Sequence, residues 1–457
     1  MDPTSPDIIP LTARARDQVY FDPDMENVEN IDGYTLGGYH PVAIGDVLGE
    51  GRYRILNKLG HGGASTAWLA RDLHAPQDLS AVEGLVTLKI MFARLSSIPL
   101  TETPDLYISH KIHTFASSIR HTSKESIHTV RNHFFEESPN GRHLCLVSEF
   151  AGPSLRSLFD WFNSGMHWQK FGNRPPHPRR MRGDLCRKFA KQLANAVELT
   201  HSAGFIHADL TPSNILLKIS KKVLSAHSVD QIFGVPVTEE LELCEGRVPS
   251  PSAPKEVVAP IHVHHFCFPS PPLIKDEILL IDFGVSLDSD HPLPPDYYPP
   301  TPIPYASPEN LLESTTGSAS DVWSLGCIIF EMRTTRPLFD TFFHTRDAVF
   351  QEIVFTLGKL PNPWWTTWKS GSYEEEGWFD EISDPTKMVT IRQKLLQVGT
   401  HDDHDADDRG SMAAKPGTRI DEEEIDLLED LLLKMLKIHP EERITMREVV
   451  RHPWFDY

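Results

Sequence analysis

Residues 204–214 read Gly-Phe-Ile-His-Ala-Asp-Leu-Thr-Pro-Ser-Asn. The stretch places His207 two positions before Asp209 and Asn214 five positions after it. A carboxylate such as that of Asp209 can accept a hydrogen bond from the hydroxyl group of a substrate. The amide oxygen of Asn214 can bind a magnesium ion. An ordinary turn rich in Ser, Thr and Pro has a similar composition. The rest of the chain must therefore decide between a polar turn and a catalytic loop.

The length and composition of the chain indicate a folded protein with two lobes or domains. Its 457 residues exceed the usual size of one compact domain, and 40% of them are hydrophobic. No stretch approaches the roughly 18 uninterrupted apolar residues of a membrane-spanning helix, so we expect no membrane contact. The acidic N-terminus lacks the apolar core of a secretory signal. Five scattered cysteines favour reduced thiols and a cytoplasmic and/or nuclear protein.

The charge of the chain points to the kind of partner it attracts. A formal net charge of −20 draws basic partners and repels nucleic acid, so we expect no direct nucleic-acid binding. Two acidic runs, Asp402–Asp408 and Asp421–Glu424, hold much of the excess and are candidates for a docking surface. The alternatives are that these runs form a solvated loop and that the charge serves solubility alone.

A glycine-rich turn lies between two predicted strands near the N-terminus. The strands are Tyr53–Leu59 and Thr66–Ala70, and the turn between them is Gly60-His61-Gly62-Gly63-Ala64-Ser65. Glycines in such a turn let backbone N–H groups approach phosphates without hindrance from side chains. An ordinary hairpin turn has the same pattern, so this stretch alone decides nothing.

The next segments predict two strands and a helix. Val86-Thr87-Leu88-Lys89 reads as a strand, in which the lysine either faces solvent or contacts a phosphate group. Ile108 and Ile112 predict a helix with Asp105 near its start. An acidic side chain at that position stabilises the N-terminal end of the helix dipole. Residues 143–150 predict a buried strand that leads into Ala151-Gly152-Pro153.

Downstream of the opening stretch the pattern continues with an insertion. The apolar residues of 185–197 recur at every fourth position and predict a helix that leads to residue 204. After Leu217 we expect an irregular, partly disordered insertion over residues 221–275, because it is rich in Pro, Ser and Val. The strand Ile278–Ile281 then precedes Asp282-Phe283-Gly284. The insertion holds a small cluster that would bind a metal ion or is incidental: His262, His264, His265 and Cys267.

In their order and spacing, these motifs resemble the eukaryotic protein-kinase family over about Gly51–Phe455. Three later motifs belong to the resemblance: Ser307-Pro308-Glu309, Asp321-Val322-Trp323-Ser324-Leu325-Gly326 and His439-Pro440-Glu441-Glu442-Arg443. Within that family the chain looks like the kinases that phosphorylate serine/arginine-rich splicing factors. The features that carry this likeness are Gly37-Gly38-Tyr39-His40-Pro41-Val42, the insertion after Leu217, and the segment Ala348–Trp365.

The resemblance implies an α+β, two-lobed protein-kinase fold. A loose acidic leader would cover residues 1–35, a small antiparallel β lobe residues 36–148, and a mainly helical lobe residues 149–457, with the insertion 221–275 inside the second lobe. The implied activity is transfer of a phosphoryl group from ATP to serine or threonine, with Mg²⁺ as the metal ion. The implied substrates are basic, Arg/Ser-rich proteins, and we expect the kinase to act as a monomer.

The resemblance also assigns a role to each candidate residue. Asp209 would be the catalytic base, and Asn214 and Asp282 would bind magnesium. Lys89 would contact the ATP phosphates, with Asp105 in the place of the glutamate that fixes this lysine. Glu309 and Arg443 would form a structural ion pair. The remaining residues implied for nucleotide binding are Leu59, Gly60, His61, Gly62, Gly63, Ala64, Ser65, Thr66, Ala67, Ser148, Glu149 and Ala151.

Three departures from the kinase pattern bear on the activity. Ala208 replaces an arginine that usually receives an activation-loop phosphate, which predicts activity without that switch. Thr211 replaces a lysine that neutralises the transferring phosphate, and Asp105 is one methylene shorter than glutamate. Both changes predict slower chemistry. A catalytically weak pseudokinase that acts as a scaffold is therefore the alternative to an active kinase, while the motifs around Asp321 and Arg443 count against a small-molecule phosphotransferase.

Overall fold

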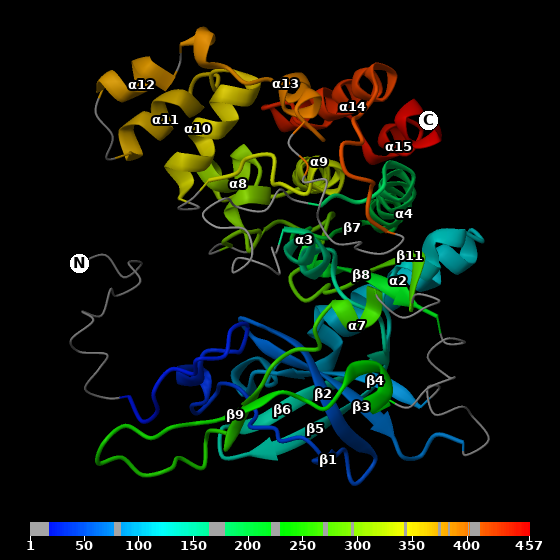
Figure 1. Ribbon diagram of the computed structural model, residues 1–457, viewed down its shortest axis with the longest axis vertical. Coiled ribbons are helices and arrows are strands. Elements are labelled where there is room, and N and C mark those ends of the chain that lie inside the picture. Colours follow the sequence, from blue (N-terminus) through cyan, green and yellow to red (C-terminus); the bar gives the residue numbers. More distant parts are fainter. Residues whose placement is uncertain are drawn as a thin grey trace. The chain divides into compact units, whose positions relative to one another are not determined.

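The computed structural model divides into two compact units (Figure 1). Unit 1 comprises residues 1–102, 129–150 and 221–265, and unit 2 comprises residues 103–128, 151–220 and 266–457. The structure describes residues 18–76, 84–163, 179–220, 229–267, 273–293, 297–341, 345–372, 376–382, 384–400, 402 and 412–457.

Unit 1 is built on one antiparallel sheet whose strands run in the order β1-β2-β3-β4-β6-β5. The strands are β1 (Val47–Leu48), β2 (Tyr53–Gly62), β3 (Ser65–Asp72), β4 (Leu85–Met91), β5 (Val130–Ser138) and β6 (Gly141–Glu149). Apolar side chains alternate along them, so that Val86, Leu88 and Ile90 of β4 are buried together. The expected strands in this region are therefore confirmed.

The expected loose leader differs from the structure over residues 18–35. Ile31, Tyr34 and Tyr39 are buried in one cluster with Phe92 and Val257. Asn30 caps a short 3₁₀ helix, Ile31–Gly33, with its side chain. An acidic composition therefore does not make this segment loose, because its few large apolar residues find partners far away in the sequence. Residues 1–17 lie outside the described residues.

The insertion also differs from the irregular segment that we expected. Between residues 229 and 267 it forms α6 (Val229–Phe233), β9 (Thr238–Glu240), β10 (Glu256–Val258) and α7 (His264–Cys267), with β9 and β10 paired in a small antiparallel sheet. Residues 221–265 group with unit 1 rather than with the helical unit in which they were placed. The flanking strands β8 (Ile215–Ile219) and β11 (Ile274–Leu280) pair with each other, so the insertion occupies the loop of a hairpin.

Unit 2 is mainly helical, in agreement with the α+β expectation. Its longer helices are α2 (Pro104–Ser118), α3 (Leu155–Asn163), α4 (Gly183–Ser202), α9 (Ser318–Thr334), α10 (Arg346–Leu357), α11 (Trp364–Gly371) and α14 (Glu422–Met435). Shorter helices are α8 (Pro308–Glu313), α12 (Glu376–Ile382), α13 (Ile391–Leu396) and α15 (Met446–Val449), and two short strands, β7 (Phe205–Ile206) and β12 (Leu287–Asp288), pair with each other.

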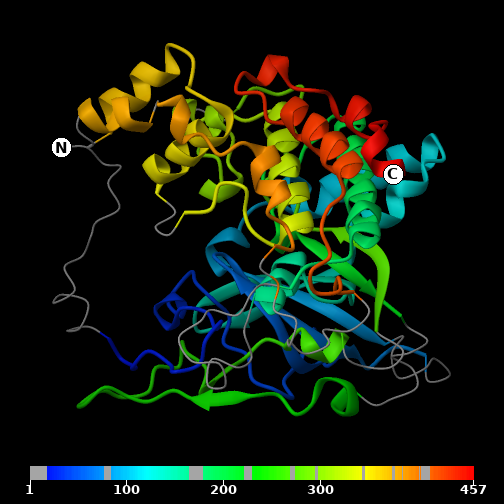
Figure 2. The same ribbon diagram turned by 45° about the horizontal axis from the view of Figure 1, so that its top comes forward.

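Helix α9 is the centre of the helical unit. Its residues Ser320–Thr334 are all buried, and it contacts α4 and α14, whose ribbons run close to it in Figure 2. The expected apolar stripe of α4 is confirmed, since Leu185, Phe189, Leu193 and Val197 are each no more than 4% exposed. A helix surrounded by other helices in this way holds a residue at its N-terminus in a fixed position, which matters for Asp321.

Two general expectations can be compared with the structure. All five cysteines are free thiols. Among the helices of the described residues, none is both long enough and apolar enough to span a lipid bilayer.

Candidate active site

The opening stretch of the sequence forms a loop that is closed by its own asparagine. A short 3₁₀ helix, Pro212–Asn214, ends the loop. The Asn214 side-chain amide donates hydrogen bonds to the Asp209 main-chain oxygen and to Asp209 Oδ2, both at 2.9 Å. Because the amide nitrogen faces Asp209, the amide oxygen points to the other side, where it is available to a cation.

Asp321 fixes the backbone of this loop from the N-terminus of α9. Its Oδ2 accepts a hydrogen bond from His207 N at 2.8 Å, and its Oδ1 accepts one from Ala208 N at 3.0 Å. Ala208 has a φ of +66°, a conformation that costs a non-glycine residue on the order of 1 kcal/mol or more. The two hydrogen bonds to a buried carboxylate offset that cost, so Asp321 is a positioning residue for Asp209.

The Asp209 carboxylate sits in an environment that resists ionisation. Burial raises its pKa to about 6, with added repulsion from Asp282 and Asp321, and this outweighs the lowering effects of His207 and Asn214. Its Oδ1 atom is buried and, within the described residues, lacks a hydrogen-bond partner. A carboxylate with one oxygen held and the other unsatisfied is suited to receive a hydroxyl group.

The Ile281–Gly284 segment lies against the same loop. His207 Nε2 donates to the Ile281 carbonyl at 3.0 Å, and Ile281 N donates to the Asn214 carbonyl at 3.0 Å. The buried Phe283 ring packs 5.1 Å from the His207 ring. Asp282 follows with a φ of +65°. Three of the predicted residues, Asp209, Asn214 and Asp282, are thereby brought together within unit 2.

Asp105 lies in the first turn of α2, at the helix N-terminus, and is only 6% exposed. A Cβ atom on Gly284 would come within 2.8 Å of Asp105 Oδ2. A side chain at position 284 would therefore press against the Asp105 carboxylate, which would have to move. The predicted pairing of Asp105 with Lys89 stays a prediction.

Three of the predicted nucleotide-binding residues of unit 1, Lys89, Ala67 and Ser148, lie on one face of its sheet. Lys89 is half-buried on β4 and stands between Ala67 of β3 and Leu146 of β6, while Thr87 on the same face stands beside Ser148. Strands β2 and β3 are joined by a tight turn at Gly63-Ala64, since Gly62 pairs with Ser65. A Cβ atom on Gly60 or Gly63 would meet nothing within 4 Å, so these glycines leave open space above the turn.

The remaining residues that were predicted to bind the nucleotide lie at the end of β6, just after it, and on β2 and β3. Ser148 is buried, and Glu149 forms an ion pair with Arg131 on β5. Ala151, the first residue of unit 2 after β6, is buried as well. The other predicted residues lie on β2 and β3: Leu59, Gly60, His61 and Gly62 on β2, and Ser65, Thr66 and Ala67 on β3, with Ala64 in the turn between them.

The predicted ion pair between Glu309 and Arg443 is confirmed. The guanidinium group of Arg443 donates to both carboxylate oxygens of Glu309 at 2.7 Å, and neither side chain is more than 5% exposed. Three main-chain carbonyls, those of Lys437, Ile438 and Ala319, accept the remaining hydrogen bonds of Arg443. The pair is fully satisfied, which is the condition for a buried ion pair to be stable.

The acidic runs proposed as a docking surface turn out to be partly structural. Asp402 forms a buried ion pair with Arg180, and Asp421 caps α14 with its side chain. Glu424 is buried and bonds to Arg333 and Arg187. Asp402 and Glu424 are therefore engaged inside unit 2, whereas Asp421, Glu422 and Glu423 are exposed. Residues 403–408 lie outside the described residues.

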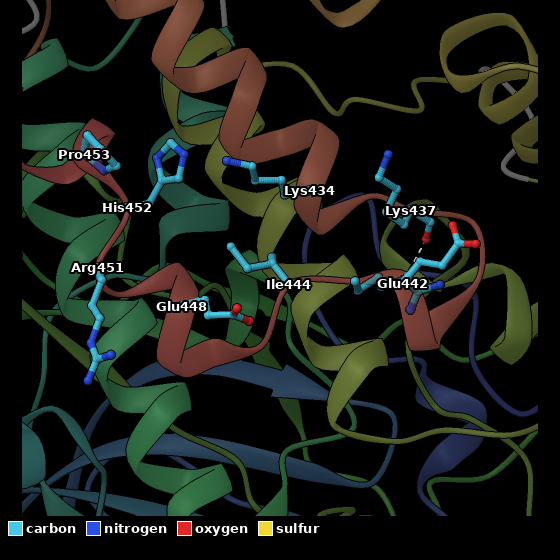
Figure 3. A pocket seen from close by; sticks show the side chains of 9 residues that line it. Lys434, Lys437, Glu442, Ile444, Glu448, Arg451, His452 and Pro453 are labelled. Carbon is cyan, nitrogen blue, oxygen red and sulfur yellow. Dashed lines mark hydrogen bonds between the residues drawn. The ribbon is translucent and has the colours of Figure 1, made fainter.

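A separate pocket lies among the last helices of unit 2 (Figure 3). It has a volume of about 480 Å³ and shares no lining residue with the loop around Asp209. Its lining residues are Lys434, Lys437, Glu442, Arg443, Ile444, Glu448, Arg451, His452 and Pro453. Most of them are exposed and the charges are mixed, so this pocket is not the candidate site.

The chemistry of the donor set fits a magnesium ion with a nucleotide. Mg²⁺ is usually held by one or two oxygen ligands of the protein together with phosphate oxygens and water. Asn214 and Asp282 offer that number of ligands. No group of three or more His, Cys, Asp or Glu residues that would hold a metal ion occurs among the described residues, the histidines of the insertion included.

The sequence alone did not assign two residues of this site. Asp321 was quoted only as part of a motif, and its role appears when its carboxylate meets the backbone of a loop more than a hundred residues earlier. Thr301 was not singled out, yet its hydroxyl donates to the Ala208 carbonyl at 2.7 Å. In the sequence, the only indication of a role for Asp321 was its position as an aspartate in the first turn of an apolar helix.

Comparisons with known proteins agree with this geometry. Residues 272–455 match the protein kinase domain family. The chain is 28% identical over 452 residues to the serine/threonine-protein kinase SRPK of Physarum polycephalum, covering 95% of this chain and 92% of that protein. It is 27% identical to the protein kinase dsk1 of Schizosaccharomyces pombe over 68% of this chain and 66% of that protein. It is also 27% identical to the serine/threonine-protein kinase SKY1 of Saccharomyces cerevisiae, over 43% of this chain and 24% of that protein.

Proposed function

Because this chain is a serine/threonine protein kinase that resembles the SRPK kinases, we propose that it transfers the γ-phosphate of ATP to serine or threonine residues of basic, Arg/Ser-rich proteins. A protein kinase domain uses ATP, typically with Mg²⁺. The partners and the location belong to the proposal: a monomer, in the cytoplasm and/or nucleus, with no direct nucleic-acid or membrane contact.

The observation that carries this proposal is the environment of Asp209. One carboxylate oxygen is held by Asn214, and the other is buried without a partner among the described residues. A pKa near 6 leaves the carboxylate ionised at neutral pH and still basic enough to accept a proton as the hydroxyl attacks. Asp321 holds the backbone of the loop in one conformation, so the serine or threonine hydroxyl of the substrate is oriented by Asp209 as soon as it binds.

Each remaining residue has a role that follows from its chemistry. Asn214 and Asp282 would hold the magnesium ion by their side-chain oxygens. Lys89 and the backbone N–H groups of the glycine-rich turn bind the phosphates. The family resemblance assigns Ser148, Glu149 and Ala151 to nucleotide binding. Bound Mg²⁺–ATP supplies the reactive phosphoryl group, and the protein supplies position and charge.

The substrate class rests on the family resemblance and on the overall charge. A net charge of −20 speeds encounters with cationic chains, even though Asp402, Asp421 and Glu424 are engaged in internal contacts. Selection of basic proteins is therefore assigned to the field of the whole chain and not to those three acids. No observation in the described residues favours the alternative, a weakly active scaffold.

The test is phosphotransfer to three synthetic peptides that carry serine among arginines, among lysines or among glutamates. The full-length protein is incubated with Mg²⁺–ATP at low salt, and incorporated phosphate is measured by mass spectrometry. The proposal predicts the fastest transfer to the Arg/Ser peptide and the slowest to the Glu/Ser peptide. Equal transfer to the Arg/Ser and Glu/Ser peptides would contradict the substrate class, and no transfer to any of them would favour the scaffold.

A further inference from the structure

Together with residues 36–46, which connect it to β1, the leader contacts the glycine-rich turn of unit 1 directly. The Tyr39 hydroxyl donates a hydrogen bond of 2.7 Å to the main-chain carbonyl of Gly62, the last residue of β2 before the turn. The turn is thus held by a contact from a residue that precedes the sheet in sequence.

Tyr39 is itself held in place on several sides. It is 5% exposed, and its ring meets the Phe92 ring edge-on at 4.3 Å and the Tyr34 ring at 5.4 Å. The Asn140 side-chain amide donates to the Tyr39 carbonyl at 2.7 Å. Because its ring and its main chain are both held in place, the Tyr39 side chain has little conformational freedom. The hydrogen bond from its hydroxyl to Gly62 therefore costs little further conformational entropy.

Phe92 links Tyr39 to both the turn and the strand of Lys89. Its main-chain N–H donates to the Ala64 carbonyl at 2.9 Å, so it bonds to the turn from the other side. Phe92 directly follows β4, the strand that carries Lys89. Tyr39, Phe92 and the turn therefore form one connected group on the sheet.

A buried ion pair anchors the leader to β2 just before the turn. Glu29 pairs with Lys58, and the Tyr34 hydroxyl donates to Glu29 Oε1 at 2.5 Å. The side chains of Glu29 and Lys58 are at most 2% exposed. Removing either partner would leave an unpaired charge in the interior, so the leader cannot leave β2 without a large cost.

The insertion contacts the same group. Val257 of β10 lies in the apolar cluster with Tyr34, Tyr39 and Phe92. The carbonyl of Ser252 accepts a second hydrogen bond from the Asn140 amide at 2.7 Å, and Ile261 N donates to the Lys58 carbonyl at 2.9 Å. The insertion is therefore part of the support and not only a linker.

We propose that the leader with its connection to β1 (residues 36–46) and the insertion together form a clamp on the glycine-rich turn, in which Tyr39, in that connection, is the positioning residue. The clamp sets the height of the turn above the sheet face that carries Lys89, and so sets the affinity for the phosphates of ATP. This inference rests on the proposed function, since it takes the turn to cover those phosphates. It gives the leader and the insertion a common role in nucleotide binding.

The test compares Tyr39→Phe with Tyr53→Phe in the full-length protein. Each change removes one hydroxyl from a buried tyrosine of unit 1, but Tyr53 bonds to Asn132 and does not contact the turn. The clamp predicts that Tyr39→Phe raises the KM for ATP and the Kd for Mg²⁺–ATP about three- to ten-fold, which is the usual worth of one hydrogen bond. The KM for the peptide and the Tm should match those of Tyr53→Phe, and amide exchange at residues 60–65 should be faster.

Two results would overturn the clamp, and they separate it from the proposed function. If the wild type transfers phosphate but Tyr39→Phe has the nucleotide affinity of Tyr53→Phe, the clamp is wrong and the kinase activity stands. If the wild type binds nucleotide without transferring phosphate, the proposed function fails, and the Kd comparison still decides for or against the clamp. If the wild type binds no nucleotide, both proposals fail.

Discussion

Replacing Asp209 by asparagine should make the protein more stable and inactive at the same time. Asparagine has the shape of aspartate and can still accept the hydrogen bond from Asn214, but it carries no charge. In the wild type the carboxylate is buried near Asp282 and Asp321, and one of its oxygens has no partner among the described residues. A charge held there for catalysis costs stability, and the variant removes that cost.

The size and pH dependence of the gain follow from the pKa of Asp209. The pKa rises from 3.8 to about 6 on folding. This rise means that the free energy of unfolding is about 3 kcal/mol lower when Asp209 is ionised than when it is neutral. The pKa of Asp209 is higher in the folded than in the unfolded protein, so protonation of Asp209 favours the folded state. The wild type therefore has its full stability below pH 3.8 and loses this contribution as the pH rises through 6. Asp209→Asn should therefore be more stable by about 3 kcal/mol at pH 8 and by about half of that at pH 5.

The assay is urea unfolding followed by tryptophan fluorescence, from pH 5 to pH 8, in EDTA and without nucleotide. Asp276→Asn is the control, because Asp276 is exposed and its ion pair with Lys188 lies at the surface, where such a pair is worth little. Phosphotransfer by Asp209→Asn should fall by at least about a hundred-fold. An Asp209→Asn protein that is no more stable than the wild type at pH 8 would refute the reasoning.

Three further outcomes are expected. Arg443→Leu should lower the free energy of unfolding by about 3–5 kcal/mol, because Glu309 is left buried and unpaired, and the double variant with Glu309→Leu should recover much of the loss in urea unfolding; a loss below about 1 kcal/mol would be inconsistent with a buried pair. Phosphatase treatment of protein made in cells should leave the rate unchanged, because Ala208 offers no charge to an activation-loop phosphate; a large loss of rate that a second kinase restores would show a phosphate switch. The KM for an Arg/Ser peptide should rise steeply with salt, since exposed charges are screened over about 8 Å at physiological ionic strength, while the KM for ATP changes much less; a salt-independent peptide KM would point to selection by contacts other than charge.

The sequence was sufficient for the elements and motifs whose pattern is local. The strands of the sheet, the helix before the catalytic loop and the placement of Asp209 and Asn214 in one loop all depend on neighbours close in the chain. The Glu309–Arg443 pair is distant in sequence, and it was predicted only because the family resemblance supplied the connection.

The features that sequence analysis missed depend on distant contacts that no local pattern reveals. Asp24 and Met25 of the leader donate main-chain hydrogen bonds to Glu239 of the insertion, and Glu29 meets Lys58. Composition therefore suggested a loose leader and an irregular insertion, since each lacks a core of its own. In the same way the acidic run at Asp402 suggested an exposed surface, while its first residue is neutralised by Arg180 from another part of unit 2.

The most direct measurement is the transfer of radiolabelled phosphate from ATP to an Arg/Ser peptide by the wild type and by Asp209→Ala, purified in the same way and with Mg²⁺ present. We expect measurable transfer by the wild type and transfer by Asp209→Ala reduced by at least about a hundred-fold, with both proteins folded by circular dichroism. Equal transfer by the two proteins would contradict the role of Asp209, and with it the assignment of this site.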